Sequence, residues 1–177
     1  QLFFFFKIEN AIAFSKGKFN FNIDLKKTKQ TIIQIDYLIG IIYLDPNQEY
    51  KVQINLGSYR FTSTGPNSGV DSDDFIDVQV STDGGLSYNS EIRVTGNNNA
   101  YWDYNSKTIS KVINGNLDIY TPSGGGDRTL LGDGYSVIEL AFPLGTRQIA
   151  IDVLVVVDRA GEEWWIDDFF LLGSGSG

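Results

Sequence analysis

The chain has 177 residues, 14% of them aromatic, with 19 glycines and a formal net charge of -8. This length suits one domain with a substantial core. The chain has no Cys, no Met and no His, which excludes Cys or His nucleophiles and bases, thiolate zinc sites, imidazole metal sites and disulfides.

The charge is unevenly distributed along the chain. Residues 1–60 hold eight Lys and Arg against five Asp and Glu, whereas residues 61–177 hold six against seventeen. An acidic second half repels the phosphates of nucleic acids, so we expect no nucleic-acid partner. Cation binding or plain solubility accounts better for these carboxylates, and most are expected to be solvated surface groups.

The chain opens at Gln1 without a methionine, so we expect a processed or truncated chain. Its pattern is one of short apolar, alternating or β-branched runs separated by turn residues. No apolar run is long enough to span a membrane, and we expect no such span. The runs predict strands over residues 2–8, 11–15, 19–25, 31–44, 50–56, 75–81, 88–94, 108–113, 117–120, 136–142, 148–157 and 162–172.

Three local features refine this pattern. Glu9-Asn10 interrupts the first strand and predicts a bend or bulge. Gly40 divides residues 31–44, which form either one long strand or two strands broken there. Asp83-Gly84-Gly85 predicts a hairpin turn, because glycine adopts positive φ freely.

Many short strands without helical periodicity predict an all-β fold, a two-sheet antiparallel jelly-roll sandwich. No internal repeat or domain boundary interrupts the pattern. We therefore expect one jelly-roll domain over residues 1–172, followed by a Gly/Ser linker or tail over residues 173–177.

The last predicted strand contains two adjacent carboxylates, Asp167 and Asp168, between bulky apolar residues. Successive side chains of a strand point to opposite faces, so one of the two is expected to face inward or towards a sheet rim. A carboxylate in that position is costly unless it is paired or bound to a metal. The strand is therefore a candidate ion site.

A second candidate ion site lies in a loop flanked by glycine. Asp71, Asp73 and Asp74 follow Gly69 closely, and neighbouring backbone carbonyls add further oxygen ligands. Calcium prefers such oxygen ligands, although the spacing is not that of an EF-hand. The alternative is an acidic turn whose carboxylates accept hydrogen bonds from backbone N–H groups.

An aromatic cluster beside amide side chains is a candidate ligand site. Tyr101, Trp102 and Tyr104 follow Asn98, and aromatic rings with amides suit the stacking and hydrogen bonding of a sugar. In strand order Trp102 and Tyr104 share one face and Tyr101 lies on the other. At least one of these rings is therefore expected in the core.

An enzyme is the less favoured class. A glycosidase needs only two carboxylates, and Glu162 or Glu163 with Glu91 or Glu139 supplies the residue types. Nothing in the spacing places any two at the required separation, and without His no Ser is activated. We expect no catalytic residues.

Residues 74–85, 94–98 and Trp102, with the ending Ile166-Asp167-Asp168-Phe169 and Leu171, resemble MAM-type domains. These are concanavalin-A-like jelly rolls, with relatives in exported bacterial proteins, and the closing strand is also similar to that of jelly-roll carbohydrate-binding modules. Animal MAM domains carry cystines that this chain lacks, which favours the bacterial-type relatives.

The resemblance implies a non-catalytic, extracellular or cell-surface binding or adhesion module with a structural calcium and a carbohydrate or protein partner. The calcium of the similar modules implies that Asp168 or Asp167 pairs with Glu9 as ligands. The alternative is a structural subunit of an extracellular filament or surface layer, assembled when the Phe-rich residues 2–8 complete a neighbour's sheet.

Overall fold

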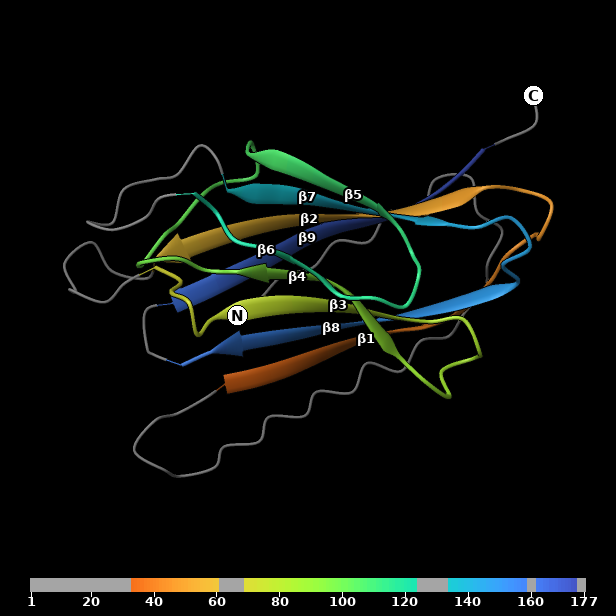
Figure 1. The fold of residues 1–177 in the computed structure, drawn as a ribbon, viewed down its shortest axis with the longest axis horizontal. Coiled ribbons are helices and arrows are strands. Elements are labelled where there is room, and N and C mark those ends of the chain that lie inside the picture. The colour runs from red at the N-terminus through yellow and green to blue at the C-terminus, as the bar shows by residue number, and fades with distance from the viewer. Residues whose placement is uncertain (1–32, 61–68, 124–133, 159–161, 175–177) are drawn as a thin grey trace.

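A computed structural model describes residues 33–60, 69–123, 134–158 and 162–174 (Figure 1). Within these ranges the backbone forms nine strands and no helix, so none of the described residues belongs to a helix that could cross a membrane. The strands predicted within residues 1–32, together with Glu9 and its bend, lie outside the described residues.

Each described strand matches a run predicted from the sequence, with ends that differ by a few residues. The strands are β1 (Ile33–Tyr43), β2 (Tyr50–Arg60), β3 (Phe75–Ser81), β4 (Asn89–Thr95), β5 (Lys107–Val112), β6 (Asp118–Tyr120), β7 (Tyr135–Phe142), β8 (Gln148–Val157) and β9 (Glu162–Gly173).

The strands form two sheets that pack face to face as a β-sandwich (Figure 1), which confirms the predicted fold class. One sheet has the order β1-β8-β3-β4-β6 and the other the order β5-β7-β2-β9. Neither sheet is wholly antiparallel, because β6 pairs with β4 and β5 with β7 in parallel. These two edge pairs depart from the antiparallel pairing that the sequence predicts, and the remaining strand pairs follow it.

The core lies between the two sheets and follows the alternation of the strands. In β7, for example, every second side chain from Ser136 to Phe142 is buried. The buried apolar side chains of β2 and β7 meet those of β3, β4 and β8. Among the largest fully buried are Trp102, Leu56, Ile76, Ile92, Ile138, Leu140, Ile149 and Ile151.

Two local predictions are confirmed by the backbone. β1 runs as one strand, with a register shift between Ile39 and Ile42 beside Gly40. Gly84 and Gly85 have φ of 81° and 83°, the left-handed conformation that the turn between β3 and β4 requires.

A buried ion pair joins the two sheets. Lys111 of β5 reaches across to Glu91 of β4, with 3.2 Å between Nζ and Oε2, and both side chains are almost fully buried. The Lys111 ammonium also donates to the Glu91 carbonyl, at 2.8 Å. The Glu91 carboxylate accepts from the backbone N–H groups of Asn114 and Gly115. These hydrogen bonds compensate the desolvation of both charges.

Trp102, which lies between β4 and β5, is fully buried, and its indole N–H donates to the Tyr135 carbonyl at 3.1 Å. Its ring meets that of Trp164 edge to face, with 5.4 Å between ring centroids. The chain segment around Trp102 also pairs with Ser58 of β2 through two backbone hydrogen bonds. Trp102 therefore ties a connecting segment to the core.

We expect Trp102→Ala to lower the free energy of unfolding by about 3–5 kcal/mol, because it removes a large side chain from a close-packed site. Trp165 is 49% exposed, so Trp165→Ala is the matched control, with an expected loss of about 1 kcal/mol or less. Equilibrium unfolding in urea measures both values. Equal losses in the two variants would contradict this assignment of the core.

Candidate metal centre

Four carboxylates meet at one end of the sandwich. Asp71 and Asp74 precede β3, Asp158 follows β8, and Glu162 begins β9. One oxygen from each lies within 4.8 Å of the others. Because β8 belongs to one sheet and β9 to the other, the cluster joins the end of one sheet's strand to the start of the other's, and it could hold a metal ion.

Asp74 is the centre of this arrangement and is fully buried. Its Oδ2 accepts from the Asp71 backbone N–H at 2.7 Å, and its Oδ1 accepts from that of Asp158 at 3.0 Å. The two bonds come from segments more than eighty residues apart in the sequence. The Asp74 side chain therefore holds the start of β3 against the end of β8.

Strand pairing explains why these residues are neighbours. β3 and β8 are antiparallel, and Phe75 lies opposite Val156. The residues just before β3 therefore lie beside those just after β8. Glu162 shares the inward face of β9 with Trp164, and both are buried. Alternation along β9 thus directs the Glu162 carboxylate into the sandwich.

Glycines let the loop approach its neighbours closely. Gly69 has φ of 104°, and Gly96 packs directly on the backbone of Val70 and Asp71. The Gly96 N–H donates to the Asp74 carbonyl at 2.9 Å. A side chain at position 96 would collide with this backbone, so the aspartate loop depends on glycine there.

The electrostatics of the centre favour a bound cation. Burial raises the pKa of Asp74 to about 6, aided by the nearby Asp71 and Asp158 carboxylates and opposed by the two backbone N–H groups that donate to it. Burial and like charge both disfavour the ionised form, and a cation at the centre would reverse both effects. The protein has no His or Cys, so the donors are oxygen atoms, which suit hard cations.

The predicted metal ligands divide between two places in the structure. Asp71 and Asp74 belong to the cluster, whereas Asp73 lies beside it and donates its backbone N–H to Asp71 Oδ1 at 2.9 Å. Asp167 and Asp168 lie further along β9 and are not members of the cluster. Glu9 lies outside the described residues.

Neither Asp167 nor Asp168, one of which was expected to face inward or towards a sheet rim, is buried in the core, and both lie on β9, an edge strand of its sheet. A β-bulge interrupts the pairing of β2 with β9, and Asp168 has a φ of 47°. Ile166 and Phe169 both pack against the core, so the bulge accommodates two carboxylates between them that remain partly exposed. The extra residue cancels the strict alternation on which the prediction rested.

The predicted ligand residues are also separated. Trp102 is fully buried, so the prediction that it contacts a ligand is wrong. Alternation along the strand predicted that at least one of the three rings lies in the core, and Trp102 is such a ring. Asn98 is exposed with a φ of 49°, and Tyr101 is partly buried. Tyr104 instead packs beside Tyr59, with 6.3 Å between ring centroids.

Sequence reasoning did not assign Asp158 or Glu162 to the metal centre, or Tyr59 and Trp165 to an aromatic group. The sequence pattern could have indicated that Glu162 faces inward, since it lies two residues from Trp164 and shares a strand face with it. Asp158 had none, because its proximity to Asp74 depends on the pairing of β3 with β8.

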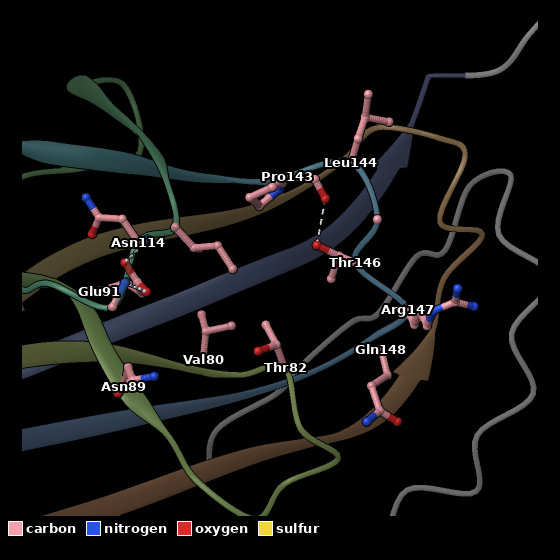
Figure 2. A pocket seen from close by; sticks show the side chains of 13 residues that line it. Val80, Thr82, Asn89, Glu91, Asn114, Pro143, Leu144, Thr146, Arg147 and Gln148 are labelled. Atoms are coloured by element: carbon pink, nitrogen blue, oxygen red, sulfur yellow. Dashed lines mark hydrogen bonds between the residues drawn. The ribbon is translucent and has the colours of Figure 1, made fainter.

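A pocket of about 650 Å³ lies at the opposite end of β8, beside the turn before Gln148 (Figure 2). Its wall includes the Asn89 amide, the exposed Arg147 and the aliphatic Leu144. Glu91 also lines it, but this carboxylate already holds Lys111 and two backbone N–H groups. The pocket therefore offers amide, guanidinium and aliphatic groups for binding.

The glutamates considered as a glycosidase pair lie in different environments. Glu91 is buried against Lys111, and Glu162 belongs to the acidic cluster. Glu139 points away from the core and pairs with Lys51 at 2.9 Å, and this hydrogen bond lowers the pKa of the Glu139 carboxyl group.

We expect the stability of the metal-free protein to fall as the pH rises from about 4 to about 6. The folded pKa of Asp74 is raised, so over this range the unfolded state loses its proton first and is favoured. The change is roughly 2–3 kcal/mol and levels off above the folded pKa. Asp74→Asn should remove this pH dependence of the free energy of unfolding, measured by urea unfolding in the presence of a chelator. An unchanged pH dependence in the variant would contradict it.

We compared the chain with protein-family models, curated proteins and solved structures, and no match was found. The resemblance to MAM-type domains and carbohydrate-binding modules therefore stays a prediction from the sequence.

Proposed function

We propose that this protein is a non-catalytic binding module that acts outside the cell and is stabilised by calcium at the four-carboxylate centre. The observation that carries the proposal is the convergence of Asp71, Asp74, Asp158 and Glu162 from both sheets around a fully buried carboxylate. The proposed partner is a carbohydrate or a protein.

Calcium suits the centre better than other common cations. It takes six to eight oxygen ligands at about 2.3–2.6 Å, so ligands on opposite sides of the ion lie about 4.6–5.2 Å apart. The four carboxylate oxygens lie within 4.8 Å of one another, which lets one calcium ion contact all four. Magnesium requires stricter octahedral geometry and keeps several waters, and thiolate or imidazole ligands for zinc do not exist in this chain.

The proposed role of the ion is structural. It would join the end of β8 to the start of β9 and so hold the two sheets together where the chain crosses between them. It would also favour the ionised form of Asp74, which burial and the nearby Asp71 and Asp158 carboxylates disfavour. No step of catalysis is assigned to it.

The proposed location follows from the concentration of calcium. Calcium sites of extracellular modules bind in the range of about 0.1–1 mM, a level that only the outside of the cell supplies. A structural calcium of this affinity would remain bound there and would leave in the cytoplasm.

The proposed binding role rests on two surfaces that the core does not use. One is the pocket beside Leu144 and Arg147. The other is the aromatic group around Trp165, which is 49% exposed. Assembly into filaments through residues 2–8 lies outside the described residues and stays a prediction.

Calcium titration tests the metal proposal. We expect saturable binding by calorimetry and, at about a hundredfold excess over the dissociation constant, a gain of about 2.7 kcal/mol in the free energy of unfolding. Glu162→Gln should weaken binding by about tenfold or more, because it removes a charged ligand from a buried site.

Glu163→Gln is the matched control. It removes the same charge from the neighbouring residue, whose side chain is on the opposite face of β9, and Glu163 does not belong to the cluster. We expect it to leave calcium affinity nearly unchanged. Equal weakening by both variants, or magnesium binding as tight as calcium binding, would overturn the proposal.

A further inference from the structure

We propose that the outer face of the β2–β9 sheet binds an arginine side chain from a basic segment of a partner protein. The site is the aromatic–acidic patch, defined as Tyr59, Tyr104 and Trp165 with Asp103, Asp167 and Asp168. This inference rests on the proposed role as a binding module and is independent of the proposed calcium.

The three rings form one continuous group on the surface. Trp165 lies opposite Gly57 in the sheet, two residues from Tyr59. Tyr59 and Trp165 have ring centroids 4.7 Å apart at an interplanar angle of 45°, and Tyr59 and Tyr104 have centroids 6.3 Å apart. Trp165 is 49% exposed, so the group presents an accessible indole beside two partly exposed phenols.

Local contacts hold the rings in this arrangement. The Trp165 indole N–H donates to Glu163 Oε2 at 3.0 Å, which fixes the orientation of the indole. Gly57 has no side chain, and a Cβ atom there would lie 2.9 Å from the Tyr59 ring. Glycine at this position therefore allows the Tyr59 ring to lie over the backbone of β2. Such a surface is organised before a ligand binds.

The charge around the rings is negative. The pKa of Tyr104 is raised to about 12, first by burial and then by the charge of Asp167, with Tyr59 and Asp168 contributing less. Burial also raises the pKa of Tyr59, and the Asp103 carboxylate adds to the shift. The bulge at Asp168 leaves two consecutive carboxylates partly exposed, and both act on Tyr104.

This combination favours a cation over a neutral sugar. A sugar can stack on an indole and donate its hydroxyls to carboxylates, but it carries no positive charge that the three carboxylates would attract. A cation gains from both the ring faces and the carboxylates. The charge of the patch therefore selects a positively charged ligand.

The shape of the patch favours a guanidinium over an ammonium group. The rings lie on a sheet surface and are tilted by 45° and 57° to one another, so they do not enclose a ligand as a cage would. A planar guanidinium stacks on an open ring face and presents a fork of N–H donors to a carboxylate. An ammonium group has one compact charge and makes fewer simultaneous contacts here.

Binding of matched peptides to the full calcium-loaded chain tests the proposal. The probe is an arginine-rich peptide in a Gly/Ser background, compared with peptides in which lysine or the neutral isostere citrulline replaces each arginine. We expect the arginine peptide to bind about threefold or more tightly than the lysine peptide, and the citrulline peptide not to bind measurably. Binding should weaken as salt is raised.

Variants locate the binding site. Trp165→Ala and Asp167→Asn should each weaken arginine-peptide binding by about three- to tenfold. Tyr43→Ala removes another exposed aromatic ring, and Glu49→Gln removes an exposed charge elsewhere. These matched controls should change affinity by less than about twofold. Trp165→Phe, which retains a ring, should lie between the wild type and Trp165→Ala, and thermal unfolding shows whether each variant is folded.

Several results would overturn the inference. They are citrulline binding equal to arginine binding, equal loss of affinity in the patch and control variants, and displacement of the peptide by a neutral oligosaccharide. If the peptide does not bind while calcium still raises the free energy of unfolding, the patch is rejected and the calcium centre is not. Peptide binding that persists without any calcium affinity would reject the proposed calcium centre and leave the patch standing.

Discussion

The end of the sandwich that carries the metal centre depends on one buried carboxylate. This carboxylate must accept hydrogen bonds from two segments that lie far apart in the sequence. Asp74 has no exposed surface and accepts backbone N–H groups from Asp71 and Asp158. An ionised group without water needs such donors. The hydrogen bonds therefore fix the loop before β3 against the end of β8 and bring Asp71 and Asp158 to the centre, whereas Glu162 reaches it from β9.

One strand supplies both of the proposed sites, because its two faces have different environments. Along the first residues of β9, Glu162 and Trp164 are directed into the sandwich, while Glu163 and Trp165 are directed away from it. The bulge at Asp168 then keeps two carboxylates off the core without exposing Ile166 and Phe169. The metal centre and the aromatic–acidic patch therefore use residues on opposite faces of β9, and separate variants can test each of them.

Much of the fold was readable locally because strand alternation and turn chemistry are properties of neighbouring residues. The β-strand runs from residue 33 onward and the glycine turn at Gly84 and Gly85 needed no tertiary information. The predictions fail where the pairing between distant strands decides the structure. Two edge strands pair in parallel, and the bulge in β9 interrupts the alternation that predicted one of two adjacent aspartates to face inward or towards a sheet rim.

By itself, the sequence determined an all-β sandwich with an oxygen-only ligand chemistry, and it identified Asp71 and Asp74 as candidate ligands. Only the tertiary structure decided that Asp158 and Glu162 join them, and that Tyr59 and Trp165 meet Tyr104. The physical reason is that strand pairing and the packing of two sheets set which residues are neighbours across long sequence separations. Periodicity along one chain segment carries no information about which other segment lies beside it.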